Sequence, residues 1–154
     1  MEVKVPDQTP VRPQSVHNSG IRQLKAERVG VDDRDVRLLP LIDGLLERCV
    51  KDGDVPKYVQ DQEIGENLAR LYPKYKEQLT VNNRLDFPSL LYAAHRLLHE
   101  VQAIARQIRT VYKHVCVEEF QDTNLAQYRV LRAIVGNEPT NLFVVADDDQ
   151  IIYQ

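Results

Sequence analysis

Carboxylate side chains follow two short apolar stretches near the end of this 154-residue chain. Glu118 and Glu119 follow the stretch His114–Val117, and the aspartates Asp147 to Asp149 follow the stretch Asn141–Ala146. Both stretches are rich in β-forming residues, so each predicts a buried strand. Mg²⁺ prefers carboxylate oxygens and substrate phosphates as ligands, and a second carboxylate can orient or deprotonate an attacking water. The pattern therefore predicts magnesium-assisted chemistry.

The segment between the two stretches determines whether their acids meet. Thr123 or Asn124 can cap a helix that Gly136-Asn137 then ends. Strand, helix and strand in this order predict a βαβ crossover, with parallel strands and a right-handed connection. Ligands bind at the carboxyl ends of parallel strands, so both acidic groups should face one site. The alternative is that the acids are solvated loop residues. A single Asp after a strand would favour this alternative, but two acidic clusters on neighbouring strands make it the less favoured one.

The charge distribution agrees with a metal at this site. Residues 118–154 hold seven acids and two bases, although the net charge of the whole chain is only −3. An acidic segment repels phosphate unless a divalent cation lies between them. Gln121 and Gln150 lie close to the same acids in the sequence and would add amide groups to the predicted site.

The upstream sequence has helical periodicity. Apolar residues recur at helical spacing in the stretches 36–50, 64–79 and 90–108, which predict three helices. Pro73 should kink or split the second helix. Asp86 is a candidate N-cap for the third.

Three segments resemble the motifs of a known protein family. VEEFQDTNLAQY, Val117–Tyr128, resembles the Walker-B-containing motif DEFQDTN of DNA helicases of the UvrD/Rep/PcrA type. ADDDQIIY, Ala146–Tyr153, resembles the next motif of that family, GDDDQSIY. Upstream, Leu85-Asp86-Phe87 and the helix after it resemble the family's LDF-x-x-LL segment. The resemblance covers roughly residues 55–154.

The resemblance implies roles for four residues. Glu118 takes the position of the aspartate that holds Mg²⁺. Glu119 takes that of the glutamate that activates the hydrolytic water, and it is the second expected metal residue. Gln150 matches the glutamine that senses the γ-phosphate of ATP. Tyr153 matches an aromatic position on the single-stranded DNA track, where bases stack. A tyrosine packed at the sheet edge is the alternative for Tyr153.

The resemblance also implies a fold, cofactors and partners. The expected fold class is α/β, with a partial RecA-like parallel sheet of P-loop-NTPase topology over residues 113–154. A mostly helical, insertion-like subdomain over 31–112 should precede it, after an extended or weakly ordered lead-in over 1–30. The expected cofactors are Mg²⁺ and ATP. The expected partners are single-stranded and duplex DNA and the remainder of the helicase, with ATP-driven 3'-5' translocation.

The chain departs from the family pattern at several positions. Glu118 replaces Asp, Ala146 replaces Gly and Ile151 replaces Ser. No G-x-x-x-x-G-K-[ST] loop, whose backbone would cradle phosphates, occurs in the sequence. We therefore expect a helicase fragment that by itself neither hydrolyses ATP at a useful rate nor unwinds DNA. Two alternatives stay open: a catalytically dead remnant that binds DNA or a protein, and a magnesium-dependent nuclease, which would leave FQDTN and Gln150 unexplained.

Other sequence features narrow the class of protein. No apolar run approaches the roughly 18 residues that span a bilayer. The first thirty residues lack the hydrophobic block of a signal peptide. Cys49 and Cys116 are too few for a disulfide framework, and Cys116 is expected to be a small buried thiol. These features fit a cytoplasmic protein without a membrane partner.

Two side-chain groups of the predicted third helix have alternative interpretations. His95 and His99, four residues apart, have a spacing that can bind zinc, but no glutamate stands between them, which favours a partly exposed helix flank. Four bases form a stripe that is either a solvated face, which we favour, or a DNA contact. These bases are Arg96, Arg106, Arg109 and Lys113.

Overall fold

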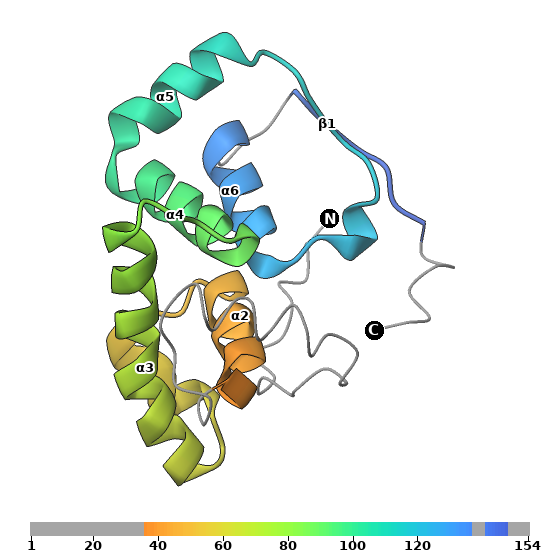
Figure 1. Ribbon diagram of the computed structural model, residues 1–154. Coiled ribbons are helices and arrows are strands. Elements are labelled where there is room, and N and C mark those ends of the chain that lie inside the picture. The colour runs from red at the N-terminus through yellow and green to blue at the C-terminus, as the bar shows by residue number, and fades with distance from the viewer. Residues whose placement is uncertain (1–35, 137–140, 148–154) are drawn as a thin grey trace. The chain divides into compact units, whose positions relative to one another are not determined.

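The computed structural model describes residues 36–136 and 141–147, drawn as coloured ribbon in Figure 1. The chain divides into two compact units, one up to Leu90 and the other from Leu91 onward. This division falls inside the stretch 31–112 that the sequence predicts as one subdomain, and the predicted boundaries stay a prediction. Within the described ranges, no helix is long and apolar enough to cross a membrane.

The first unit begins with the 3-10 turn η1 (Val36–Leu38), followed by the helix α2 (Leu39–Glu47). Cys49 ends this helix with a left-handed backbone, at φ 54°. The amide of Cys49 donates to Leu46 O (2.9 Å), and the amide of Val50 donates to Leu45 O (3.0 Å). This pair of bonds is a Schellman motif, which satisfies carbonyls that the end of a helix would leave unpaired.

Helix α3 (Gln62–Val81) follows the 3-10 segment η2 (Asp52–Tyr58), against which it packs. The Asp61 side chain caps α3 by accepting from the amide of Ile64 at 2.9 Å. The sequence predicts that Pro73 kinks or splits this helix. The helix runs through Pro73, so the predicted split is wrong, and the kink stays a prediction. Proline removes one hydrogen bond from a helix, and the buried apolar side chains on either side of Pro73 hold the two halves in one helix.

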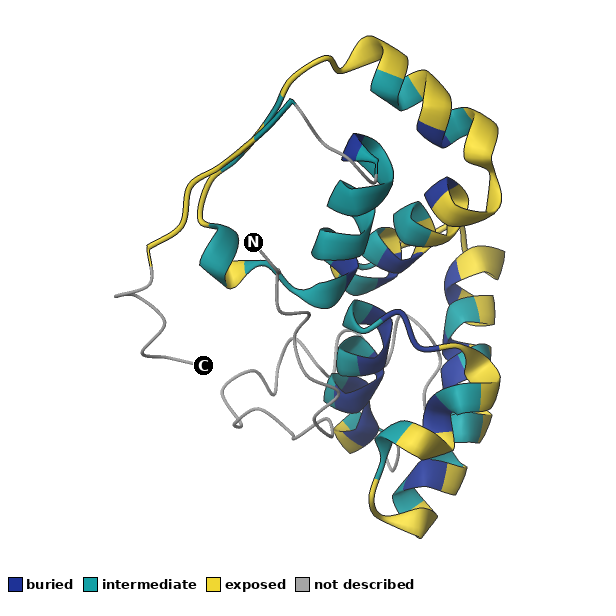
Figure 2. Ribbon diagram, turned by 180° about the vertical axis from the view of Figure 1, so that it is seen from behind, coloured by how far each residue is buried: buried dark blue, intermediate teal, exposed yellow. Residues whose placement is uncertain are grey.

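The core of the first unit lies where α2, η2 and α3 meet, as the buried positions in Figure 2 show. Tyr72 and Tyr75 are its largest fully buried side chains. The Tyr72 hydroxyl donates to Val50 O at 2.9 Å, and the Tyr75 hydroxyl donates to the Asp86 carboxylate. These bonds tie α3 to the segment after α2 and to the segment before the next helix. The other fully buried side chains are Leu39, Ile42, Leu45, Leu46, Val55 and Leu68.

The predicted third helix is two helices, α4 (Phe87–Glu100) and α5 (Gln102–Val111). The backbone leaves the helical region at Val101, with φ −109° and ψ 78°. Val101 is β-branched and exposed, so its helix propensity is low and packing does not compensate for it. The Gln102 side chain donates to His99 O at 2.8 Å and so pairs a carbonyl at the end of α4. The prediction of one helix over 90–108 is therefore wrong.

The second unit also contains the strand β1 (Val115–Val117), the 3-10 turn η3 (Phe120–Asp122), the helix α6 (Leu125–Val135) and the strand β2 (Leu142–Val144). The strands pair in parallel, with Val117 opposite Val144. This confirms the predicted strand–helix–strand unit with parallel strands. Helix α6 packs against α5.

The two strands are not buried, contrary to the prediction. Cys116, expected to be a buried thiol, is exposed, and Phe143 opposite it is 65% exposed. A parallel sheet is buried only where other elements cover both of its faces. Within the second unit, the described residues leave β1 and β2 at intermediate or exposed positions, as the colours in Figure 2 show.

Candidate functional site at the strand ends

The loop after β1 turns sharply at the predicted catalytic acid. Glu118 follows Val117, and Glu119 adopts the left-handed conformation, at φ 51° and ψ 41°. A residue with a Cβ atom pays about 1–2 kcal/mol for this conformation. The turn ends the strand and leads directly into η3 (Phe120–Asp122).

Backbone hydrogen bonds hold the loop after β1 against the end of β2. The amide of Val145 donates to Val117 O at 2.8 Å, and the amide of Phe120 donates to Val145 O at 3.1 Å. Pairing between the two segments therefore continues beyond the last strand residues. The first of the three aspartates, Asp147, lies two residues further along.

Gln121 connects the two acidic ends. Its Nε2 donates to Glu119 Oε2 at 2.5 Å, and its Oε1 accepts from the backbone amide of Asp147 at 3.0 Å. The structure thus brings the end of β1 and the end of β2 together, as the sequence predicts for parallel strands. Gln121 is the residue whose role the sequence did not reveal. The only signal was its place near the acids, because an amide contacting both ends cannot be read from spacing.

The donor chemistry of this site fits a hard cation. The side chains of Glu118, Glu119 and Asp147 are exposed, so their oxygens are accessible to an ion and its waters. The described residues contain no group of three or more His, Cys, Asp or Glu side chains arranged to hold a metal. Mg²⁺ does not need such a group, because it takes one or two protein carboxylates together with waters and substrate phosphates. Asp148, Asp149, Gln150 and Tyr153 lie outside the described residues, so their predicted roles stay predictions.

The two histidines of α4 lie side by side, with ring centroids 5.8 Å apart and planes inclined at 57°. Nδ1 of His95 is buried and has no hydrogen-bond partner among the described residues. Burial lowers the pKa of His95, and the nearby charge of Arg129 and the ring of His99 lower it further. The lowered pKa favours the neutral form of His95. Within the described ranges no third ligand joins the pair.

Two residues of the predicted basic stripe have partners within their own helices. Arg96 forms an ion pair with Glu100, with Nε 2.8 Å from Oε1. Arg109 Nε donates to Ala105 O at 3.1 Å. These contacts fit a solvated helix face better than a DNA contact that requires all four bases.

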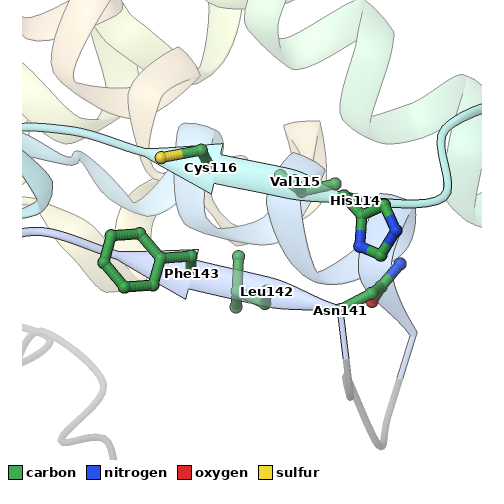
Figure 3. A pocket seen from close by; sticks show the side chains of 6 residues that line it. All are labelled: His114, Val115, Cys116, Asn141, Leu142 and Phe143. Atoms are coloured by element: carbon green, nitrogen blue, oxygen red, sulfur yellow. The ribbon is translucent and has the colours of Figure 1, made fainter.

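A hollow of about 430 Å³ lies at the opposite ends of the strands from the acids (Figure 3). Its lining contains no carboxylate, so it is separate from the acidic strand ends. The Asn141 side chain donates to Lys113 O at 2.7 Å beside it. The lining residues are His114, Val115, Cys116, Asn141, Leu142 and Phe143.

The described residues are mostly helical and include a parallel strand–helix–strand unit with acidic residues at its strand ends. This arrangement is consistent with the α/β class, in which ligands bind at the carboxyl ends of the strands. The comparison with known families is more specific. Residues 11–154 match the family model of the UvrD/REP helicase N-terminal domain, and the chain belongs to this family.

Individual relatives agree with this assignment. The ATP-dependent DNA helicase UvrD1 of Mycobacterium tuberculosis is 37% identical over 97 residues, which cover 59% of this chain and 13% of the relative. The probable DNA helicase II homolog of Mycoplasma genitalium is 31% identical over 122 residues, covering 79% of this chain and 16% of the relative. The ATP-dependent DNA helicase PcrA of Staphylococcus epidermidis is 36% identical over 86 residues, covering 56% of this chain and 12% of the relative. The chain thus spans a small part of the length of these relatives.

Proposed function

We propose that this chain contributes the metal-binding and water-activating side of an ATP-hydrolysing site in a UvrD-like DNA helicase. The observation that carries the proposal is the junction of the two strand ends, where Gln121 contacts both the Glu119 carboxylate and the Asp147 backbone. This junction belongs to a chain of the UvrD/REP helicase N-terminal domain family, whose relatives are named ATP-dependent DNA helicases. The proposed fold around the site is a RecA-like parallel sheet.

Each acid has a separate task in this proposal. Glu118, the first residue after β1, supplies the carboxylate oxygen that binds Mg²⁺. Bound there with the phosphates of ATP, Mg²⁺ would neutralise charge that develops on the phosphate oxygens. Glu119 orients the attacking water and accepts its proton, and its carboxylate is the second that would contact the metal or the waters bound to it. Because Glu118 is one methylene longer than an aspartate, it has an extra torsion, and its metal affinity should be correspondingly weaker.

Two further roles depend on the second motif. Gln150 is proposed to contact the γ-phosphate, so that hydrolysis alters the position of the loop that carries it. Tyr153 is proposed to stack on a base of single-stranded DNA. By resemblance of the motif, translocation would run 3'-5' along that strand.

A manganese-binding measurement tests the metal side of the proposal. Mn²⁺ replaces Mg²⁺ at oxygen sites and can be followed by the relaxation of water protons in a solution of the full chain. We expect the double variant Glu118→Gln/Glu119→Gln to lose binding, and Glu63→Gln/Glu77→Gln, which removes two exposed carboxylates of α3, to retain it. Equal binding by the two double variants would contradict the proposed site.

A second measurement separates this function from the alternatives. Calorimetry with Mg²⁺ and a non-hydrolysable ATP analogue should show nucleotide binding that depends on the metal and is lost in Glu118→Gln. DNA binding without any nucleotide binding would favour a non-catalytic module. Metal-dependent cleavage of DNA in the absence of ATP would favour a nuclease.

A further inference from the structure

Gln121 uses both halves of one amide group to join two segments that are far apart in the sequence. Nε2 donates to the Glu119 carboxylate at 2.5 Å, while Oε1 accepts from the Asp147 amide at 3.0 Å. The backbone amide of Phe120 donates to Val145 O at 3.1 Å, and this bond holds the loop after β1 against the segment after β2. The contact at Asp147 therefore determines where Nε2 lies, and Nε2 in turn contacts the carboxylate.

We propose that Gln121 is a positioning residue for the Glu119 carboxylate. The inference rests on the proposed function, because it takes Glu119 to be the group that activates water. The Glu119 side chain is exposed and would otherwise exchange among several rotamers. A hydrogen bond to an ionised group is roughly twice as strong as one between neutral groups, so the bond to Nε2 selects one of them. The anchor on Asp147 holds that rotamer in a fixed position relative to the end of β2.

The chemistry of the connection requires glutamine. A donor and an acceptor must stand at the same end of one side chain, and only Asn and Gln offer both in a neutral amide. Asparagine is one methylene shorter and cannot span the same two contacts. Glutamate would keep the acceptor for Asp147 but would place a second negative charge against Glu119.

The bond itself is tested by nuclear magnetic resonance on the full chain labelled with ¹⁵N. We expect a side-chain amide proton of Gln121 to be shifted downfield and slowed in solvent exchange. The shift and the protection should be lost in Glu119→Met, which removes the acceptor oxygens, and stay unchanged in Glu118→Met, a matched control at the neighbouring position. An unshifted and rapidly exchanging amide signal of Gln121 in the wild type, or the same response in both variants, would overturn the inference.

The positioning role is tested by Mn²⁺ affinity. Loss of a group that orients a metal-site carboxylate typically weakens metal binding by 10–100-fold, and at this exposed site we expect about tenfold for Gln121→Met. Gln107→Met, at an exposed position of α5, is the control and should bind as the wild type does. Equal urea midpoints of the two variants would show that the fold is intact, which separates positioning from a purely structural role.

The outcomes distinguish the two proposals. If the wild type binds Mn²⁺ and Gln121→Met binds it equally well, Gln121 does not position Glu119, and the proposed function stands. If the wild type does not bind Mn²⁺, the proposed metal site fails, and the positioning role fails with it. Weaker binding by Gln121→Met alone supports both.

Discussion

Replacement of Tyr75 by phenylalanine tests how the first unit holds Asp86 in place. The Tyr75 side chain is 1% exposed, and its hydroxyl donates to Asp86 Oδ2. The other oxygen of Asp86 accepts from the amide of Ser89 at 2.8 Å and thereby caps α4. One carboxylate thus joins α3 to the first turn of α4. Phenylalanine keeps the ring and its packing, so Tyr75→Phe removes the hydrogen bond without leaving a cavity.

The expected cost follows from the charge of the acceptor. A hydrogen bond to a charged group contributes about 1.5–3 kcal/mol, and the partial exposure of Asp86 places this one at the lower end. The free energy of unfolding typically falls by about 1–3 kcal/mol per molar urea, so the urea midpoint should fall by roughly 1 M. Tyr112→Phe, at a position that is 60% exposed, should leave the midpoint unchanged.

The assay is urea unfolding followed by circular dichroism, extended to a double-mutant cycle with Asp86→Ala. Asp86→Ala removes both the cap and the bond to Tyr75, and the cycle cancels the contribution of the cap. We expect a coupling energy of about 1 kcal/mol or more between the two positions. A coupling below about 0.3 kcal/mol, within the usual error of additivity, would refute the reasoning.

Three further predictions concern the second unit. Burial lowers the pKa of His95 in the folded chain, so the unfolded chain binds more protons below pH 6.5 and the free energy of unfolding should fall as the pH drops through that value. His95→Gln should therefore flatten the dependence of the urea midpoint on pH between about 5 and 7.5. Gly136→Ala should lower the free energy of unfolding by about 1–3 kcal/mol, because φ is +86° and the new Cβ would lie 3.3 Å from the Arg109 side chain. Gly53→Ala is the control: its new Cβ meets nothing within 4 Å, so the free energy of unfolding should change by less than about 0.5 kcal/mol. Asn124→Ala should lower the free energy of unfolding by about 1 kcal/mol, since it removes the capping box with Gln127, and Asn124→Asp should retain most of it.

Local signals in the sequence predicted much of the fold. Asp86 caps α4 and Asn124 caps α6, as expected from residues whose short side chains reach back to the backbone. Gly136 ends α6 with a positive φ, as expected of a glycine after a helix. Each of these features depends on a few neighbouring residues, and a sequence pattern contains all of the information that they need.

The errors occurred where distant contacts decide the outcome. Apolar periodicity continues through Val101, but the pattern does not record where the backbone leaves the helix. Pro73 does not split α3, because packing of the buried residues on both sides outweighs one lost hydrogen bond. The exposure of Cys116 could not be predicted either, since an apolar strand has the same sequence whether or not other elements cover it.

The candidate site combines both kinds of information. Glu118 and Glu119 were predicted from their place after a strand, and the parallel pairing that brings Asp147 to the loop after β1 followed from the order of elements. The left-handed turn at Glu119 did not follow, because glutamate has no local preference for that conformation.

The turn at Glu119 persists because contacts made by the two residues that follow it offset its cost. The left-handed backbone costs about 1–2 kcal/mol, which is close to what one or two net hydrogen bonds contribute at about 0.5–1.5 kcal/mol each. The bond from Phe120 to Val145 O and the bond from Gln121 to the Glu119 carboxylate are available only after the chain has turned. The strain therefore lies at the residue with the proposed chemical role. The same two bonds that offset the strain also fix that residue relative to the second strand.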